Sequence, residues 1–433
     1  MMSKVTSLVL LILMALTGSA FAQHEQAFPF NFNDGSDPQG DLISDAAGNL
    51  YGTTTYGGNG ACDDERGHLG CGTVFEMSPP VPPNGQWTLK TLHSFDINVD
   101  DVAYPIGNLV FDSMGNLYGV SSGGGAYFEG AVFELSPQSG GSWNLALLFS
   151  FTCGTCNPQG GLVIDSTGNL YGTALGEGDC GRVQCGAIYE VSQSGGQWLL
   201  QDLYVFEGGE DGAAPIGSVT FDSQGNLYGT TTSAAAFGFG GVFRLSPPSM
   251  QGQLWTETTL HSFGSVPNDG TTPTAGVTLG PDGTLVGTTY EGGFTGGNCG
   301  SVGCGTVFGL APPSSPGGQW GYRVLYSFGA VPGDAERPYS GLSLLTSKSG
   351  TVAYGTTIYG GSSGQGTVFE LIQSSPGVWT ETPVYSFSGG RDGGQPVAGV
   401  LLQGNALYGT TVEGGVSYKN CPFGCGTVFR LSH

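Results

Sequence analysis

The sequence predicts an all-β protein, a seven-bladed β-propeller made of four-stranded antiparallel blades. Short sequence blocks recur along the whole chain at a spacing that leaves room for four strands in each unit. In addition, the N-terminal segment matches the strand that the last unit lacks. A ring closed by that segment would leave no exposed sheet edge.

The first block reads Gly-Asn-Leu-Tyr-Gly in its clearest form and supplies the second strand of each unit. Its closing glycines lie between 53 and 68 residues apart, which sets the length of one unit. Four copies are clear and three are weaker, and together they occupy residues 48–52, 115–119, 168–172, 225–229, 283–287, 350–355 and 404–409. A repeat of this length is typical of propellers.

Two further blocks supply the third and fourth strands. The third strand reads Gly-Thr-Val-Phe, and its copies begin at Gly72, Gly130, Gly186, Gly240, Gly305, Gly366 and Gly426. The fourth begins at a tryptophan and ends eight residues later at a phenylalanine, over residues 87–95, 143–151, 198–206, 255–263, 320–328 and 379–387. These blocks contain all six tryptophans, so each tryptophan is first of all a framework residue.

The first strand of each unit follows a Pro-x-Gly or Pro-x-x-Gly entry, as in the stretch 161–164. It ends in a turn such as 165–168, with Asp first and Gly fourth. A linear solenoid is the alternative to a ring. The last unit stops after its third strand, however, and the segment 28–32 leads into Pro38 as the fourth strands lead into their prolines. We therefore expect the N-terminal strand to complete the last blade.

Residues 1–22 read as a secretory signal peptide, with Lys4, an apolar run over 5–16 and a small-residue cleavage site at 20–22. We expect a single propeller domain over 23–433, exported to the periplasm or outside the cell and monomeric. Net charge is −23, from 34 acidic and 11 basic residues, which argues against nucleic acid as a partner. No apolar run after the signal is long enough to span a membrane.

The ten cysteines form five pairs that are close in sequence, which in an exported chain predicts five local disulfides. The pairs are Cys62 with Cys71, Cys153 with Cys156, Cys180 with Cys185, Cys299 with Cys304, and Cys421 with Cys425. A redox role for the Cys-x-x-Cys pair would require a βαβ unit, which the sequence does not predict. A zinc site would require a second pair of ligands, and none has the necessary spacing. Blade topology predicts that all ten lie on one face, together with the longest loops.

Six aspartates, each four residues before a strand-one proline, are the sharpest pattern outside the framework: Asp34, Asp101, Asp211, Asp269, Asp334 and Asp392. If they surround the mouth of the channel, they form a calcium site or a funnel for a cationic ligand. If they accept backbone N–H groups, they only cap turns, and their repetition favours this second interpretation. Asp112, Asp165 and Asp222 are interpreted as hairpin-turn residues, and His93 and His261 as strand residues in register. Apart from calcium, no cofactor is expected.

The recurring pattern GNLYGTT…GG…GTVFEL resembles the GloVer tandem repeat of bacterial "choice-of-anchor" proteins. The resemblance spans nearly the whole chain after the signal peptide and implies an exported protein of propeller-like repeats. It brings no catalytic residues with it. Many such proteins carry a C-terminal anchor, which we do not expect here because only four residues follow Phe429.

The leading functional hypothesis is a non-catalytic binding or scaffold protein that recognises a glycan, a protein or a cell-surface component. The alternative is a carbohydrate-active enzyme, a glycosidase or lyase, using paired carboxylates such as Glu210 with Asp211 or Asp334 with Glu336. A purely structural envelope protein is the third hypothesis.

Overall fold

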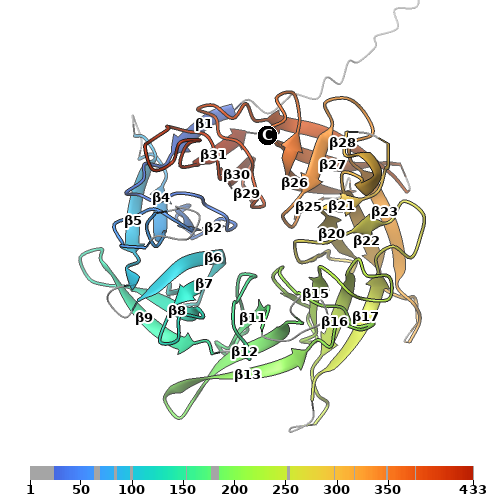
Figure 1. Ribbon diagram of the computed structural model, residues 1–433, viewed down its shortest axis with the longest axis horizontal. Helices are drawn as coiled ribbons and strands as arrows, with labels where there is room; N and C mark the ends of the chain where they lie inside the picture. The colour runs from blue at the N-terminus through green and yellow to red at the C-terminus, as the bar shows by residue number, and fades with distance from the viewer. Residues whose placement is uncertain are drawn as a thin grey trace, which may run out of the picture.

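The protein is a ring of seven antiparallel sheets around a central channel (Figure 1). The computed structural model describes residues 24–432 apart from 63–68, 82–84, 98–100, 153, 177–184, 251–253, 297, 316, 348–349 and 376. The predicted seven-bladed propeller of four-stranded blades is confirmed. Within the described residues, no helix has the length and apolar character needed to cross a bilayer. The predicted signal peptide lies outside the described residues.

Each blade is numbered in ring order, and its strands are given from the channel outward. Blade 1 comprises β2 (Ile43–Ser44), β3 (Leu50–Thr54), β4 (Thr73–Ser78) and β5 (Thr88–Ser94). Blade 2 comprises β6 (Val102–Phe111), β7 (Leu117–Gly124), β8 (Ala131–Pro137) and β9 (Trp143–Ser150). Blade 3 comprises β10 (Val163–Ile164), β11 (Leu170–Ala174), β12 (Ala187–Ser194) and β13 (Gln197–Val205). Blades 4 and 5 comprise β14 (Thr220–Phe221), β15 (Leu227–Thr231), β16 (Gly241–Ser246) and β17 (Thr256–Ser262); and β19 (Thr278–Leu279), β20 (Leu285–Thr289), β22 (Thr306–Ala311) and β23 (Gly321–Ser327).

Blade 6 comprises β25 (Ser343–Ser347), β26 (Gly350–Gly360), β27 (Thr367–Ser375) and β28 (Val378–Ser386), and β24 (Ala335–Pro338) pairs with the far end of β26. Blade 7 comprises β29 (Leu401–Gln403), β30 (Ala406–Thr411), β31 (Thr427–Ser432) and β1 (His24–Pro29). A small ladder, β18 (Gly270–Thr271) with β21 (Glu291–Gly292), and one 3-10 turn, η2 (Gly300–Val302), lie in the loops.

The N-terminal strand closes the ring, as predicted. β1 pairs antiparallel with β31, with Phe28 opposite Val428 and Ala27 opposite Phe429. β1 and β31 lie side by side in Figure 1, so strands from the two ends of the described chain share one sheet. The outer strand of the last blade is therefore the first strand of the described chain, which joins the ends of the repeat array without a free inner edge.

A closed ring of aromatic pairs joins each blade to the next. The phenylalanine that ends each fourth-strand block packs against the aromatic residue of the next blade's third strand, with ring centroids 5.0–5.3 Å apart; six pairs are edge-on and Phe387–Phe429 is tilted. The pairs are Phe30–Phe75, Phe95–Phe133, Phe151–Tyr189, Phe206–Phe243, Phe263–Phe308, Phe328–Phe369 and Phe387–Phe429. Each such contact contributes about 1 kcal/mol beyond its area burial.

The same aromatic residues explain the second glycine of the Leu-Tyr-Gly block. A Cβ atom at Gly229 would lie 2.6 Å from Cζ of Phe243, and one at Gly409 would lie 2.5 Å from Cζ of Phe429. These distances are shorter than any carbon–carbon contact that packed side chains tolerate. The repeat therefore needs glycine at this position because the ring of the third strand lies directly over it.

The two threonines that follow this glycine also have defined contacts, as blade 5 shows. The Thr288 hydroxyl donates to the carbonyl oxygen of Ser340 in the next blade at 2.8 Å. Thr289 and Thr306 join the second and third strands through their hydroxyls, also at 2.8 Å. Because both threonines are buried, these hydrogen bonds satisfy polar atoms that would otherwise be costly.

A backbone hydrogen bond from a strained residue joins each blade to its neighbour. The residue before every strand-one proline has a positive φ of 52–60°, although none of the seven is glycine. In each case its N–H donates to the preceding blade; for example, Arg337 donates to the carbonyl of Cys304 at 2.7 Å. The seven residues are Asp37, Tyr104, Asn157, Ala214, Thr272, Arg337 and Gln395. The strain costs about 1 kcal/mol or more at each site and recurs because the inter-blade hydrogen bond requires it.

Three predicted disulfides are confirmed: Cys62–Cys71, Cys299–Cys304 and Cys421–Cys425. Cys185 is also disulfide-bonded, and its predicted partner Cys180 lies outside the described residues, as does Cys153. The loops that carry these cysteines contact the inter-blade loops; Gly58 N–H, for example, donates to the Phe32 carbonyl at 2.8 Å. We call this side of the ring the disulfide face.

Blade 3 departs from the aromatic pattern because Tyr189 replaces phenylalanine. Its ring is fully buried, and its hydroxyl has no hydrogen-bond partner in the described structure. Burial raises the pKa of this phenol well above its usual value. An unsatisfied buried hydroxyl destabilises the folded state.

We therefore expect Tyr189→Phe to raise the free energy of unfolding by about 1 kcal/mol. The reciprocal control, Phe243→Tyr, places a hydroxyl at the matching position of blade 4 and should lower stability by a similar amount. Urea unfolding with the disulfides intact measures both. A loss of stability in Tyr189→Phe would show that the hydroxyl has a partner, such as a buried water molecule.

Candidate functional site

The central channel is lined by the residues that follow the strand-one prolines, and it encloses a cavity of about 380 Å³. This volume is within the range of small-molecule sites. The inner strands approach so closely that a Cβ atom at Gly217 would lie 2.2 Å from the Gly276 nitrogen. The glycines of the Pro-x-Gly entries thus bring the backbones together, and the residues on either side of them form the wall.

Two positions in each blade carry residues that differ from blade to blade around this wall. The residue directly after the proline is Gln39, Ile106, Gln159, Ile216, Thr274, Tyr339 or Val397. The residue two positions further on is Asp41, Asn108, Gly161, Ser218, Gly276, Gly341 or Gly399. Asp41 is therefore the one ionisable side chain among the seven equivalent positions of the second set.

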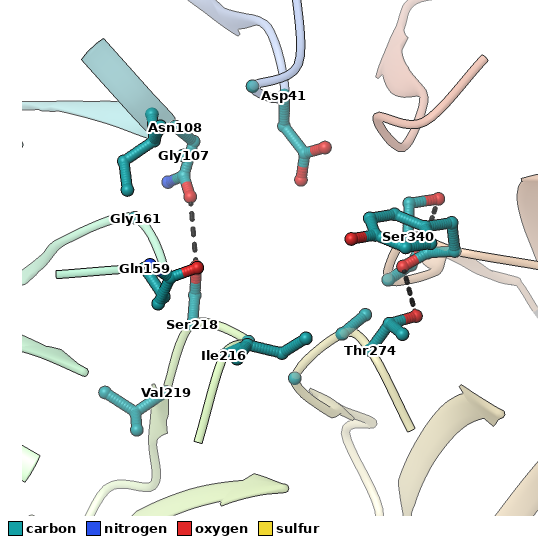
Figure 2. A pocket seen from close by; sticks show the side chains of 18 of the residues that line it. Asp41, Gly107, Asn108, Gln159, Gly161, Ile216, Ser218, Val219, Thr274 and Ser340 are labelled. Carbon is teal, nitrogen blue, oxygen red and sulfur yellow. Dashed lines mark hydrogen bonds between the residues drawn. The ribbon is translucent and has the colours of Figure 1, made fainter. Parts of the chain in front are cut away.

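The Asp41 carboxylate points into the channel (Figure 2). Its Oδ1 atom accepts a hydrogen bond from the Gly399 N–H of blade 7 at 2.6 Å. Asp41 is exposed to the open space of the channel, while the walls of the channel lie around it. Desolvation by these walls raises the pKa of Asp41, and the hydrogen bond from Gly399 offsets part of the shift.

Neutral polar side chains complete the channel wall. Ser218 donates to the Asn108 Oδ1 atom at 3.2 Å, and Thr274 donates to the Tyr339 carbonyl at 2.9 Å (Figure 2). Gln159 lies on the same side of the channel as Asn108, and Ile216 projects between Ser218 and Thr274. The arrangement offers one carboxylate together with amides and hydroxyls, groups that suit a small polar ligand.

The six predicted aspartates do not line this channel. Five of them accept hydrogen bonds from the outer strand of the preceding blade, through a histidine or tyrosine six residues after its tryptophan: His93 to Asp101, Tyr204 to Asp211, His261 to Asp269, Tyr326 to Asp334 and Tyr385 to Asp392. Asp34 bonds Asn31 instead. The side chains of these aspartates are therefore held by contacts with the outer strand or with their own loop.

These aspartates also cap turns, as the second interpretation held. Asp269 accepts the N–H groups of Gly264 and Ser265 at 2.9 and 3.0 Å, and Asp392 accepts that of Ser388 at 2.8 Å. The sequence contains a signal for the strand-four partner. The one unit with Gly154 in place of aspartate also has Phe149 where the other tryptophan-led units have His or Tyr.

The electrostatics of these contacts differ between blades. Burial alone would raise the pKa of Asp269, but hydrogen bonds from His261 and Tyr322 outweigh it and lower the pKa. For Asp334, burial prevails over its hydrogen bonds and raises the pKa. Burial, together with the nearby charge of Asp334, raises the pKa of Glu381 to about 8. Glu381 therefore carries its proton at neutral pH.

The remaining candidate residues have structural contacts. Asp112, Asp165 and Asp222 each accept two turn N–H groups and an asparagine side chain, which confirms hairpin turns. Within the described part of the chain, the group with metal-ligand spacing is Cys299, Cys304 and Glu336. The two sulfurs form a disulfide and are not thiolate ligands, while Glu336 accepts a hydrogen bond from Asn298 at 2.6 Å.

The model of the Gloeobacter/Verrucomicrobia repeat matches residues 14–183 and 62–301, about two thirds of the chain. The chain belongs to this family. Membership in the Gloeobacter/Verrucomicrobia repeat family agrees with the repeating blocks and assigns no activity to any residue. No curated protein has a significant match to the chain.

Several solved structures resemble this Gloeobacter/Verrucomicrobia repeat protein at low identity. The periplasmic gluconolactonase of Pseudomonas aeruginosa is 13% identical, with 79% of this chain and 83% of that chain covered and a TM-score of 0.43. A putative 6-phosphogluconolactonase from Bacteroides uniformis is also 13% identical, with 79% and 86% covered and a TM-score of 0.45. The GH93 α-L-arabinofuranosidase of Fusarium graminearum is 11% identical, with 75% and 91% covered and a TM-score of 0.44. No site residue is transferred from them.

Replacing Glu381 with Gln removes a carboxyl group that stays protonated in the folded state. The folded protein holds this proton more tightly than the unfolded chain, in which glutamate has a pKa of about 4.3. Its stabilising contribution is therefore complete at low pH and is lost as the pH rises toward 8. The wild type should therefore lose stability between pH 5 and pH 8. Glu381→Gln lacks this titrating group, so its free energy of unfolding should fall by about 1–3 kcal/mol less over the same interval.

Urea unfolding at both pH values measures this difference. Glu207→Gln is the matched control because Glu207 is exposed, and it should follow the wild type. The same loss of stability in Glu381→Gln and the wild type would contradict the assignment.

Proposed function

We propose that this protein is an exported, non-catalytic propeller that binds a small carbohydrate in its central channel. The observation that carries the proposal is that Asp41 places a carboxylate at a channel position where no other blade has an ionisable side chain. The polar residues that do repeat from blade to blade make framework contacts instead. Sites that bind one ligand molecule need such a break in symmetry, because equivalent side chains from seven blades would present the same group on all sides.

The chemistry of the wall supports a carbohydrate ligand. The carboxylate accepts hydrogen bonds, and the amide and hydroxyl groups both accept and donate them, so together they match sugar hydroxyls. The Tyr339 side chain, 38% exposed, also lines the channel and offers an apolar ring face beside these polar groups. The disulfides and the predicted signal peptide support export, since disulfides persist in oxidising compartments.

The carbohydrate-active enzyme is the alternative. Glycosidases act through two carboxylates that flank the scissile bond, whereas the described channel lining offers one. In the pairs considered from sequence, Asp211 and Asp334 are bonded to the outer-strand residues Tyr204 and Tyr326. These contacts favour binding over hydrolysis.

Narrowing the channel should weaken ligand binding. Ile216 occupies the register position at which blade 6 has Tyr339, so Ile216→Trp places a large ring in the channel at a site where the fold holds an aromatic residue elsewhere. We expect the wild type to bind at least one member of a panel of neutral, N-acetylated and amino oligosaccharides. Ile216→Trp should lower that affinity by about tenfold or more, equivalent to about 1.4 kcal/mol.

Isothermal titration calorimetry measures the affinities, and Met114→Trp, at a position that is 80% exposed on a turn, is the control. Equal affinity in Ile216→Trp and the wild type would place the site elsewhere. Release of new reducing ends from any oligosaccharide in the panel would contradict a non-catalytic role.

A further inference from the structure

The charge of Asp41 has no counter-ion in the channel. No lysine, arginine or histidine is among the described residues that line the cavity. Gly399 N–H satisfies Oδ1, and the other carboxylate oxygen receives no hydrogen bond from the described residues. A carboxylate that faces the channel without a counter-ion is available to form a charge-assisted hydrogen bond with a positive group of a ligand.

Small residues leave the Asp41 carboxylate uncovered. Blade 7 has Gly399 at the equivalent position, and at the equivalent position of blade 6 a Cβ atom on Gly341 would meet no atom within 4 Å. A Cβ atom at Gly399 would lie 3.3 Å from the Asp41 Oδ1 atom, closer than most side chains tolerate. The neighbouring blade on the other side contributes Asn108, whose amide lies beside the same opening (Figure 2).

The charge of the whole chain acts in the same direction. With 34 acidic and 11 basic residues, the protein has a strongly negative field. Low-dielectric walls of one sign concentrate such a field in a cleft. A cation is therefore drawn to the channel, and an anionic ligand is repelled from it.

We propose that the carbohydrate held in the channel is an amino sugar whose free primary ammonium group pairs with Asp41. This inference rests on the proposed carbohydrate-binding function and names its ligand class. The ammonium group would donate to the free Asp41 oxygen, and the Asn108 and Ser218 side chains would bond the adjacent hydroxyls.

A single ammonium group suits the site better than a metal ion. Calcium takes six to eight oxygen ligands, commonly with several carboxylates, and Asp41 is the one carboxylate among the described residues of the channel wall. One carboxylate balances one ammonium charge, and the three N–H donors of that group leave two for amide or hydroxyl oxygens. The exposed Tyr339 ring in the same wall adds a surface to which a cation is attracted.

Two trisaccharides that differ only at the nitrogen test the inference. The probes are the β-1,4-linked glucosamine trimer, which has free amines, and the matching N-acetylglucosamine trimer, which is uncharged. Titration calorimetry compares both with the wild type, Asp41→Asn and Glu207→Gln, at a pH where the amine is protonated. Asp41→Asn keeps the shape and the acceptor for Gly399 N–H, and Glu207→Gln removes an exposed charge of the same sign.

We expect the wild type and Glu207→Gln to bind the glucosamine trimer about tenfold or more tightly than the acetylated trimer. Asp41→Asn should lose that preference while its thermal unfolding stays close to that of the wild type. Equal binding of both trimers, or an unchanged preference in Asp41→Asn, would overturn the inference and leave the carbohydrate-binding function standing. If neither trimer nor any other oligosaccharide bound, both proposals would fail.

Discussion

The closed ring of aromatic pairs is the contact on which the rest of the structure depends. Each blade ends its outer strand with a phenylalanine that lies against an aromatic residue of the next blade. In the pair that closes the ring, Phe30 of the N-terminal segment lies against Phe75 of blade 1. No blade therefore buries its aromatic core alone. The glycine beneath each third-strand ring makes room for that ring within its own blade, and threonine hydrogen bonds add to the contacts between blades.

This constraint separates framework from function. Residues that recur around the ring, including the six tryptophans, the hairpin aspartates and the strained position before each proline, have contacts that account for their repetition. The two channel-facing positions after each proline vary from blade to blade because they make no contact with the aromatic pairs. Asp41 is the residue at which this variation introduces a charge, and both proposals rest on it.

The fold was predictable from sequence because its determinants recur. The repeat blocks predicted the strands, the vacancy in the last unit predicted the closure by β1, and close spacing predicted the disulfides Cys62–Cys71, Cys299–Cys304 and Cys421–Cys425. The position of the six aspartates was not predictable in the same way. Spacing before a proline places Asp269 in a loop, but only the fold shows that His261 and Tyr322 hold its side chain near the outer strand. Asp41 has no distinguishing pattern in the sequence, because only the closed ring brings the seven positions after the prolines together around one channel.

The most direct test of the account is a crystal structure of the protein grown with the glucosamine trimer. The account predicts ligand density inside the central channel, with an amine nitrogen within hydrogen-bond distance of the Asp41 carboxylate and the seven aromatic pairs unchanged around it. Ligand density on the loops of the disulfide face, with an empty channel, would contradict the central claim that the break in symmetry at Asp41 marks the binding site.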